Sequence, residues 1–174
     1  MIGALLAGCQ AAPTPSTTAQ SSAAATTPAP ATAVASVEPD RVIVERKFTL
    51  EESEIKAEVV QFRRRDRFVQ LSFRLTAIHG SGAIGWSVHN NFSAVPNDQP
   101  TIDGVYLIDT KNAKKHLTAV DSEGRCVCSS TRAVYLRTGD TITLSATFTA
   151  PPPDITAMTV HIPLVGTLSD VPLS

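Results

Sequence analysis

The chain has 174 residues, which is enough for one folded domain with a tail. Its 15 Lys and Arg residues nearly balance 16 Asp and Glu residues, and the formal net charge is −1 at pH 7. Domains that bind nucleic acid normally carry a basic patch or an excess of positive charge. The composition therefore argues against a nucleic-acid partner.

The N-terminal residues 1–7 form a short apolar run that overlaps the sequence Leu-Ala-Gly-Cys at residues 6–9. This tetrapeptide resembles the lipobox of bacterial lipoproteins, in which the cysteine thiol receives a diacylglyceryl group and a peptidase cuts just before it. A complete signal has a basic start and an apolar stretch of about 7–15 residues, so residues 1–8 are expected to be a partial signal peptide. The resemblance implies that Cys9 is lipidated and holds the protein on the extracytoplasmic face of the cell membrane. The alternative is a chance match in an Ala-rich segment.

Residues 10–39 consist almost entirely of Ala, Ser, Thr, Pro and Val. They contain no aromatic residue and show no hydrophobic period, so they bury too little apolar surface to offset the entropy cost of ordering the chain. Five prolines in this stretch further disfavour a helix. We therefore expect a disordered tether over residues 9–40 and a folded domain over residues 41–174.

Apolar and polar residues alternate in short runs from residue 42 onward, which predicts β-strands with one buried face. The strands expected from this pattern are residues 55–59, 69–77, 86–88, 102–108, 115–120, 141–149 and 158–162. Turn residues lie between them at 63–66, 109–112, 138–140 and 151–154. No segment predicts a helix, and about seven short strands indicate an all-β, antiparallel two-sheet sandwich.

Several segments of this region follow a recognisable order. Residues 104–109 precede Lys-Lys-His at 114–116, residues 136–141 and 150–156 lead into later strands, and Cys-x-Cys-Ser follows an Asp-x-x-Gly turn. This order resembles the immunoglobulin-like (telokin-like) domains of secreted actinobacterial lipoproteins, over roughly residues 52–174. The resemblance implies an immunoglobulin-like sandwich for residues 41–174 and carries little information on activity.

Cys126 and Cys128 are the most distinctive chemical pair in the folded region. Outside the membrane, an even pair of cysteines is more often oxidised than free. Side chains two apart on an ideal strand are too distant for a disulfide, so a bond between them needs a turn, which Gly124 favours. The alternatives are a redox-active pair, free thiols, or a soft-metal site completed by His116 or Asp121. We favour a structural disulfide and expect no bound cofactor.

Residues 80–100 form a long segment with little periodicity, and long loops carry binding residues more often than sheet faces do. The candidate ligand contacts in this segment are therefore Trp86, His89 and Asn90. For Trp86 we favour a place in the core, with ligand contact as the alternative. For His89 we favour an ordinary surface position, with ligand contact as the alternative.

Arg63, Arg64 and Arg65 lie in a predicted turn and form a basic tip there. One interpretation is contact with anionic lipid head groups or wall phosphates, at about 1 kcal/mol for each charge near such a surface. The other is a solvated hairpin turn.

No catalytic motif is present, since the sequence has neither Gly-x-Ser-x-Gly nor His-Glu-x-x-His, and the pair Glu51 and Glu52 is typical of a solvated surface. We therefore expect a binding module rather than an enzyme. It is expected to be anchored by lipid and to contact an envelope protein or a wall polymer through its loops. The alternative function is metal binding or redox chemistry at Cys126 and Cys128.

Overall fold

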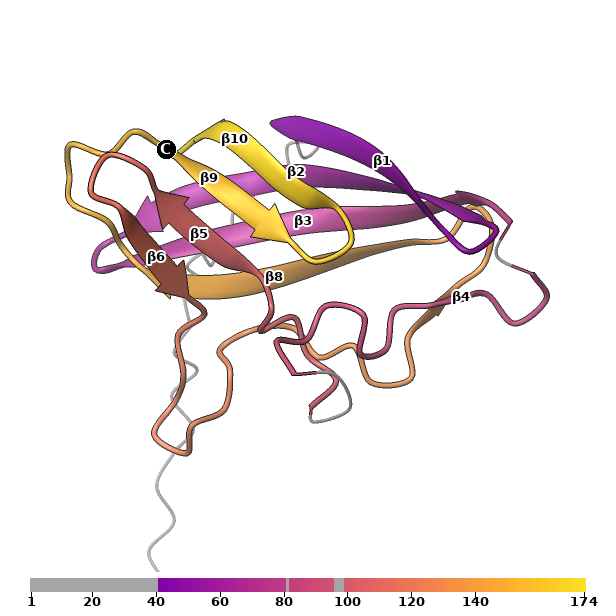
Figure 1. Ribbon diagram of the computed structural model, residues 1–174. Helices are drawn as coiled ribbons and strands as arrows, with labels where there is room; N and C mark the ends of the chain where they lie inside the picture. The colour runs from indigo at the N-terminus through magenta and orange to yellow at the C-terminus, as the bar shows by residue number, and fades with distance from the viewer. Residues whose placement is uncertain (1–40, 81, 96–98) are drawn as a thin grey trace, which may run out of the picture. The chain divides into compact units, whose positions relative to one another are not determined.

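The structure is a computed structural model that describes residues 41–80, 82–95 and 99–174. The predicted signal peptide, Cys9 and the predicted tether lie outside the described residues. All strands of the described part pair antiparallel and no helix occurs there, which confirms the all-β prediction (Figure 1). Within these ranges there is accordingly no apolar helix that could cross a membrane.

In the described part of the chain, ten strands form two four-stranded sheets and one two-stranded sheet. The first sheet has the order β1-β2-β3-β8 and consists of β1 (Val44–Leu50), β2 (Ser53–Arg65), β3 (Phe68–His79) and β8 (Thr141–Thr149). The second sheet has the order β10-β9-β5-β6 and consists of β5 (Tyr106–Asp109), β6 (Lys114–Leu117), β9 (Ala157–Ile162) and β10 (Gly166–Pro172). The short strands β4 (Trp86–Ser87) and β7 (Tyr135–Leu136) pair with each other.

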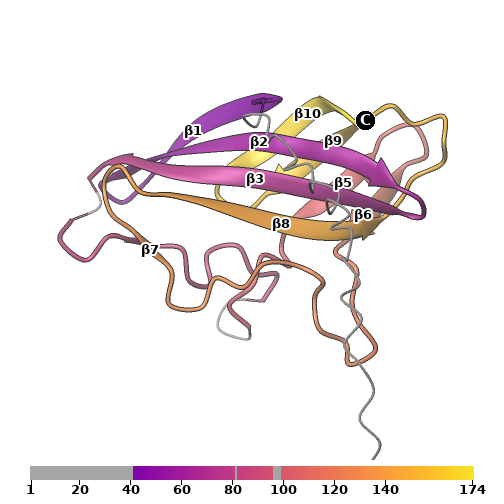
Figure 2. The ribbon, with the colours of Figure 1, turned by 180° about the vertical axis from the view of Figure 1, so that it is seen from behind.

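The two four-stranded sheets contribute their inward faces to a single hydrophobic core. In β3, Leu71 and Phe73 are 0 % exposed, and in β9 Val160 and Ile162 are also 0 % exposed. Figures 1 and 2 show the second sheet lying across one face of the first. Full burial of such a side chain contributes about 1.5–3 kcal/mol. The alternation of apolar residues therefore fixes which face of each strand turns inward.

Seven of the ten strands lie where the alternation predicts them, whereas β1, β7 and β10 are not apparent from the pattern. In β1, charged residues stand in a row at 45–47, as is common in an edge strand. In β10, a bulge between Leu168 and Val171 places the two buried residues three apart and breaks the period of two. The strand β7 has only two residues, which is too short to show any period.

The predicted strand at 102–108 is wrong at its start, because β5 begins only at Tyr106. The backbone N–H of Val105 donates a hydrogen bond to the carbonyl oxygen of Ile102 at 3.0 Å, which closes a turn around Gly104. A Cβ at Gly104 would lie 2.6 Å from the carbonyl oxygen of Phe92. The close approach of these two backbone segments replaces the expected strand.

Asp109 fixes the turn between β5 and β6. Its Oδ1 accepts a hydrogen bond from the backbone N–H of Asn112 at 3.0 Å, and its Oδ2 accepts one from Asn112 Nδ2 at 2.7 Å. Burial raises the pKa of Asp109, but the hydrogen bonds from Asn112 outweigh it and hold the pKa below its ordinary value. The register of this hairpin pairs Lys115 with Ile108 and so places Lys115 on the outer face of the second sheet.

Candidate functional site

A pocket of about 450 Å³ lies between the β1–β2 turn and the loop that joins β3 to β4. This size falls within the range of small-ligand sites. We call it the Trp86 pocket, and its lining residues are Glu51, Glu52, Ser53, Gly80, Gly82, Gly85, Trp86 and Ser87. It contains one of the three binding residues expected in the 80–100 segment.

Glycine permits the close backbone approach that forms one wall of the Trp86 pocket. Gly80 has a φ of +80°, and a Cβ there would lie 1.7 Å from the carbonyl oxygen of Glu52. The hydroxyl of Ser53 donates a hydrogen bond to the carbonyl oxygen of Gly80 at 3.2 Å. The β1–β2 turn and the start of the β3–β4 loop are therefore held together through backbone atoms that no other residue type at position 80 would allow.

Trp86 belongs both to the core and to the pocket. It is 5 % exposed, and its ring makes edge-on contacts with Phe48 and Phe92 at centroid distances of 6.0 and 6.1 Å. Its indole Nε1 is buried and has no hydrogen-bond partner in the described part of the chain. A buried tryptophan N–H usually has an acceptor, so this unpaired donor next to the pocket is unusual.

The glutamates at and beside the pocket differ in whether they form ion pairs. Glu54 is paired with Lys47 at 3.2 Å and with His79 at 2.7 Å, and the hydrogen bond from Lys47 lowers the pKa of this carboxyl. Neither Glu51 nor Glu52 forms an ion pair with any described residue, and both are exposed. The rim therefore favours a ligand group that donates hydrogen bonds or carries positive charge.

His89 and Asn90 do not line the Trp86 pocket. The Nδ1 atom of His89 accepts a hydrogen bond from the backbone N–H of Ala133 at 3.3 Å. Asn90 has a φ of 62° and lies in the turn that the N–H of Asn91 closes onto the carbonyl oxygen of Val88. In this structure the two residues shape the loop after β4 and are not grouped with Trp86.

The turn predicted at residues 63–66 is wrong in its placement, because Arg63, Arg64 and Arg65 belong to β2. Contact of these arginines with an anionic surface stays a prediction. The turn lies at Asp66, whose φ is 53°. The guanidinium of Arg64 donates to the carbonyl oxygens of Pro151, Pro152 and Ile155 at 2.6, 3.1 and 3.2 Å, so it holds the loop after β8. Of the three arginines, only Arg65 is exposed.

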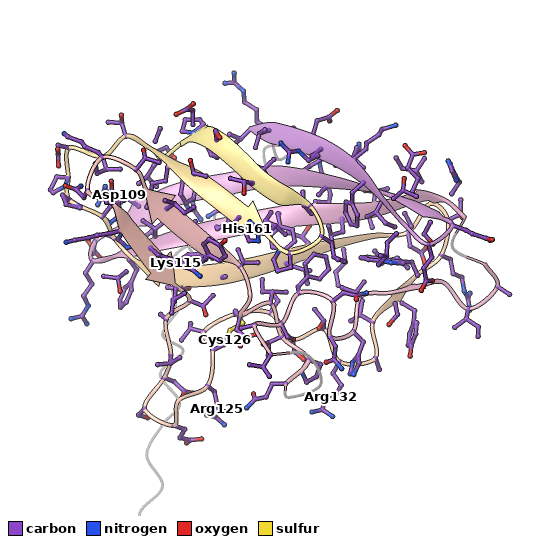
Figure 3. The ribbon with its side chains drawn as sticks, in the orientation of Figure 1. Asp109, Lys115, Arg125, Cys126, Arg132 and His161 are labelled. Atoms are coloured by element: carbon purple, nitrogen blue, oxygen red, sulfur yellow. A yellow bond between two sulfur atoms is a disulfide. The ribbon has the colours of Figure 1, made fainter. Side chains whose placement is uncertain are left out.

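Cys126 and Cys128 are joined in a disulfide, with Cα atoms 5.2 Å apart. They lie in the segment 118–130, which we call the disulfide hairpin; Figure 3 labels Cys126 and Arg125 on it. The hairpin runs along the edge of β8 that faces away from β3, where Cys128 bridges to Ala146 and the N–H of Ser129 donates to Ser145 at 2.8 Å. The cysteines thus belong to a segment that covers a sheet edge.

Asp121 orders the tip of the disulfide hairpin. Its Oδ1 accepts the N–H groups of Glu123 and Arg125, each at 2.9 Å, and its Oδ2 accepts Arg125 Nε at 3.0 Å. The backbone hydrogen bond from Arg125 lowers the pKa of this carboxyl most. Asp121 is therefore engaged within the hairpin.

The alternative metal site finds little support in this geometry. Both sulfur atoms are bonded to each other, whereas a metal needs thiolates. The Nδ1 atom of His116 is hydrogen-bonded with the carbonyl oxygen of Thr149 at 3.0 Å. Over the described ranges, no group of three His, Cys, Asp or Glu residues is placed to hold a metal ion.

No family model, curated protein or solved structure matches this chain. The candidate site therefore rests on the geometry above, and the resemblance to immunoglobulin-like domains stays a prediction.

We expect Gly80→Ala to lower the free energy of unfolding by about 3 kcal/mol or more, because its Cβ would collide with backbone at a positive φ. The matched control is Gly82→Ala, where φ is +59° but no atom lies within 4 Å of the added Cβ. That control should lose only about 1 kcal/mol. Urea unfolding of both variants measures the difference, and equal losses would contradict the close approach.

Replacing Cys126 and Cys128 together by Ser is expected to lower the free energy of unfolding by about 1–2 kcal/mol, since the disulfide closes a very short loop. Metal content, measured by elemental analysis of the purified protein, should be the same in the variant and the parent. A loss of bound metal with unchanged stability would restore the metal-site alternative.

Proposed function

We propose that this protein is a lipid-anchored, extracytoplasmic binding module of the bacterial cell envelope that holds a ligand in the Trp86 pocket. The observation that carries the proposal is the pocket itself. It combines a rim of two carboxylates outside any ion pair among the described residues with a backbone wall and with Trp86 in its lining. A concave site in which a few polar groups converge is a candidate binding site.

The location is supported by sequence alone. The Leu-Ala-Gly-Cys sequence at residues 6–9 supports acylation at Cys9. The uncharged Ala, Ser, Thr and Pro composition that follows supports a spacer between the lipid and the folded domain.

The strand order supports an immunoglobulin-like sandwich. The order β2-β3-β8 corresponds to strands A, B and E of that fold, and β10-β9-β5-β6 corresponds to G, F, C and C′. The disulfide hairpin takes the place of strand D beside β8. In this assignment β1 is an additional strand. The Cys126–Cys128 disulfide lies within one hairpin, whereas the disulfide of antibody domains joins the two sheets.

The ligand proposed for the Trp86 pocket is a wall polymer. Glu51 and Glu52 accept hydrogen bonds from amines and hydroxyls. Wall peptidoglycan carries amine and hydroxyl groups on neighbouring units and so matches these two acceptors. An envelope protein that presents a lysine to the same rim is the alternative partner.

We expect the double variant Glu51→Gln/Glu52→Gln to reduce co-sedimentation with purified peptidoglycan about five- to tenfold, because two rim charges are lost. Glu45→Gln is the matched control, since Glu45 is an exposed carboxylate of β1 that does not line the pocket. Equal sedimentation of all three proteins would refute the assigned site. Crosslinking from position 52 to an envelope protein, without sedimentation of the parent, would identify a protein partner instead.

The anchor is tested by the intact mass of the protein extracted from membranes, with a free-thiol count on the same sample. We expect a chain that begins at Cys9, carries added acyl chains and has no free thiol. An unprocessed N-terminus that includes residues 1–8 would remove the basis for the proposed location.

A further inference from the structure

A second group of polar side chains lies on the outer face of the second sheet, independent of the Trp86 pocket. Tyr106 of β5 is paired in register with His161 of β9, and their rings stack at 4.4 Å with an interplanar angle of 19°. On the other side of β5, Lys115 Nζ lies 3.7 Å from the centroid of the Tyr106 ring. Figure 3 shows Lys115 and His161 on neighbouring parts of this sheet. We call the three residues the Lys115 row.

Three polar groups of the Lys115 row have no hydrogen-bond or ion-pair partner in the described part of the chain. Lys115 forms no ion pair, and neither the Tyr106 hydroxyl nor His161 Nε2 has a hydrogen-bond partner among the described residues. His161 Nδ1 is hydrogen-bonded with the Thr167 hydroxyl at 3.2 Å. When Thr167 donates to Nδ1, the ring proton lies on Nε2, which is then a donor.

The three strands that carry the row present no acidic side chain at their outward positions beside it, and the exposed Asp170 belongs to β10, which pairs with β9. The outward positions of β5, β6 and β9 in register with the row are Tyr106, Ile108, Lys115, Leu117, Thr159 and His161, and none is acidic. Asp109, the acidic residue of β5, is 1 % exposed on the inward face and is engaged with Asn112. Burial and the charge of Lys115 lower the pKa of His161, which favours the neutral imidazole. The row therefore presents one cation and neutral donors.

This donor set points to an oxyanion rather than to a cation or a sugar ring. Both faces of the Tyr106 ring are occupied, one by His161 and the other by Lys115, which leaves no free aromatic face for stacking. Lysine binds phosphate as a point charge, whereas flat carboxylates are matched best by the fork of arginine. Lys115 and His161 lie on opposite faces of the Tyr106 ring, so an anion that contacts both has to sit at the hydroxyl edge of that ring.

We propose that the Lys115 row binds a phosphate group, with Lys115 supplying the charge and the Tyr106 hydroxyl and His161 Nε2 supplying hydrogen bonds. The row lies on a sheet face and not in an enclosed pocket, so the phosphate belongs to a ligand that approaches from solvent. That phosphate comes either from free or polymer-borne phosphate or from a lipid head group.

The test is an NMR titration of the full-length, isotope-labelled chain with inorganic phosphate, and in a second arm with vesicles of phosphatidylglycerol. We expect the His161 ring signals to shift saturably in at least one arm. A response to inorganic phosphate identifies free or polymer-borne phosphate as the source, and a response to vesicles alone identifies the lipid head group. Absence of any shift at His161 in both arms would overturn the proposal, as would an equal response to acetate.

Lys115→Gln should weaken the phosphate response about fivefold, which is the upper range for one exposed charge pair. Lys114→Gln is the matched control. Lys114 is the residue before Lys115 on β6, but its position is opposite Asp109 in the strand register, so it lies on the other face of the sheet. Tyr106→Phe retains the ring and removes only the hydroxyl, so it tests the same site without disturbing the stack. Equal affinities in all three variants would show that the row does not hold the anion.

Discussion

Burial of the inward side chains of two four-stranded sheets in one core is the constraint on which the other features of this domain depend. Leu71 and Phe73 of one sheet and Val160 of the other are fully excluded from solvent, so each strand has one face committed to packing. The outer faces and the loops at the strand ends are left for the ligand contacts that we propose. The Trp86 pocket lies at a loop end, and the Lys115 row lies on an outer face.

The two sites differ in how the fold positions them. The Trp86 pocket depends on backbone contact, because the carbonyl oxygen of Glu52 approaches Gly80 more closely than any Cβ would permit. The Lys115 row depends on strand register, because pairing of β5 with both β9 and β6 brings His161 and Lys115 to opposite faces of one tyrosine ring. The pocket rim is acidic and the row is cationic, so the ligand groups that they favour have opposite charge.

Strand positions follow from the sequence to the extent that one face of a strand is buried along its length. The long strands β3 and β8 have uninterrupted alternation and are predicted almost to their ends. β10 escapes detection because a bulge shifts its buried residues, and β1 because an edge strand tolerates consecutive charges. The arginines at 63–65 are typical of a turn by composition, yet β2 continues through them because Arg64 finds three carbonyl acceptors far along the chain.

Only part of the two candidate sites could be predicted from the sequence, because both depend on contacts between distant segments. Trp86 stands out because it is the one tryptophan in a segment without periodicity. The sequence around Glu51 and Glu52 does not indicate that they line a pocket, because the opposite wall includes Gly80, 28 residues beyond Glu52. The Gly80-Ser81-Gly82 sequence by itself indicates only a turn. The Lys115 row is assembled across three strands, and register between distant strands is not encoded in any one segment.

The disulfide hairpin illustrates how the most conspicuous residues of a sequence can serve architecture. The edge of β8 that does not pair with β3 would otherwise present a row of unpaired backbone groups, which is a site for pairing with another chain. The N–H of Thr147 donates to Val127, between the two cysteines, and the N–H of Ser129 donates to Ser145. The disulfide between Cys126 and Cys128 restrains Val127, which accepts the first of these hydrogen bonds. Asp121 orders the tip of the hairpin. The pair therefore stabilises the cover of a sheet edge, and the binding sites that we propose lie elsewhere, in the Trp86 pocket and on the second sheet.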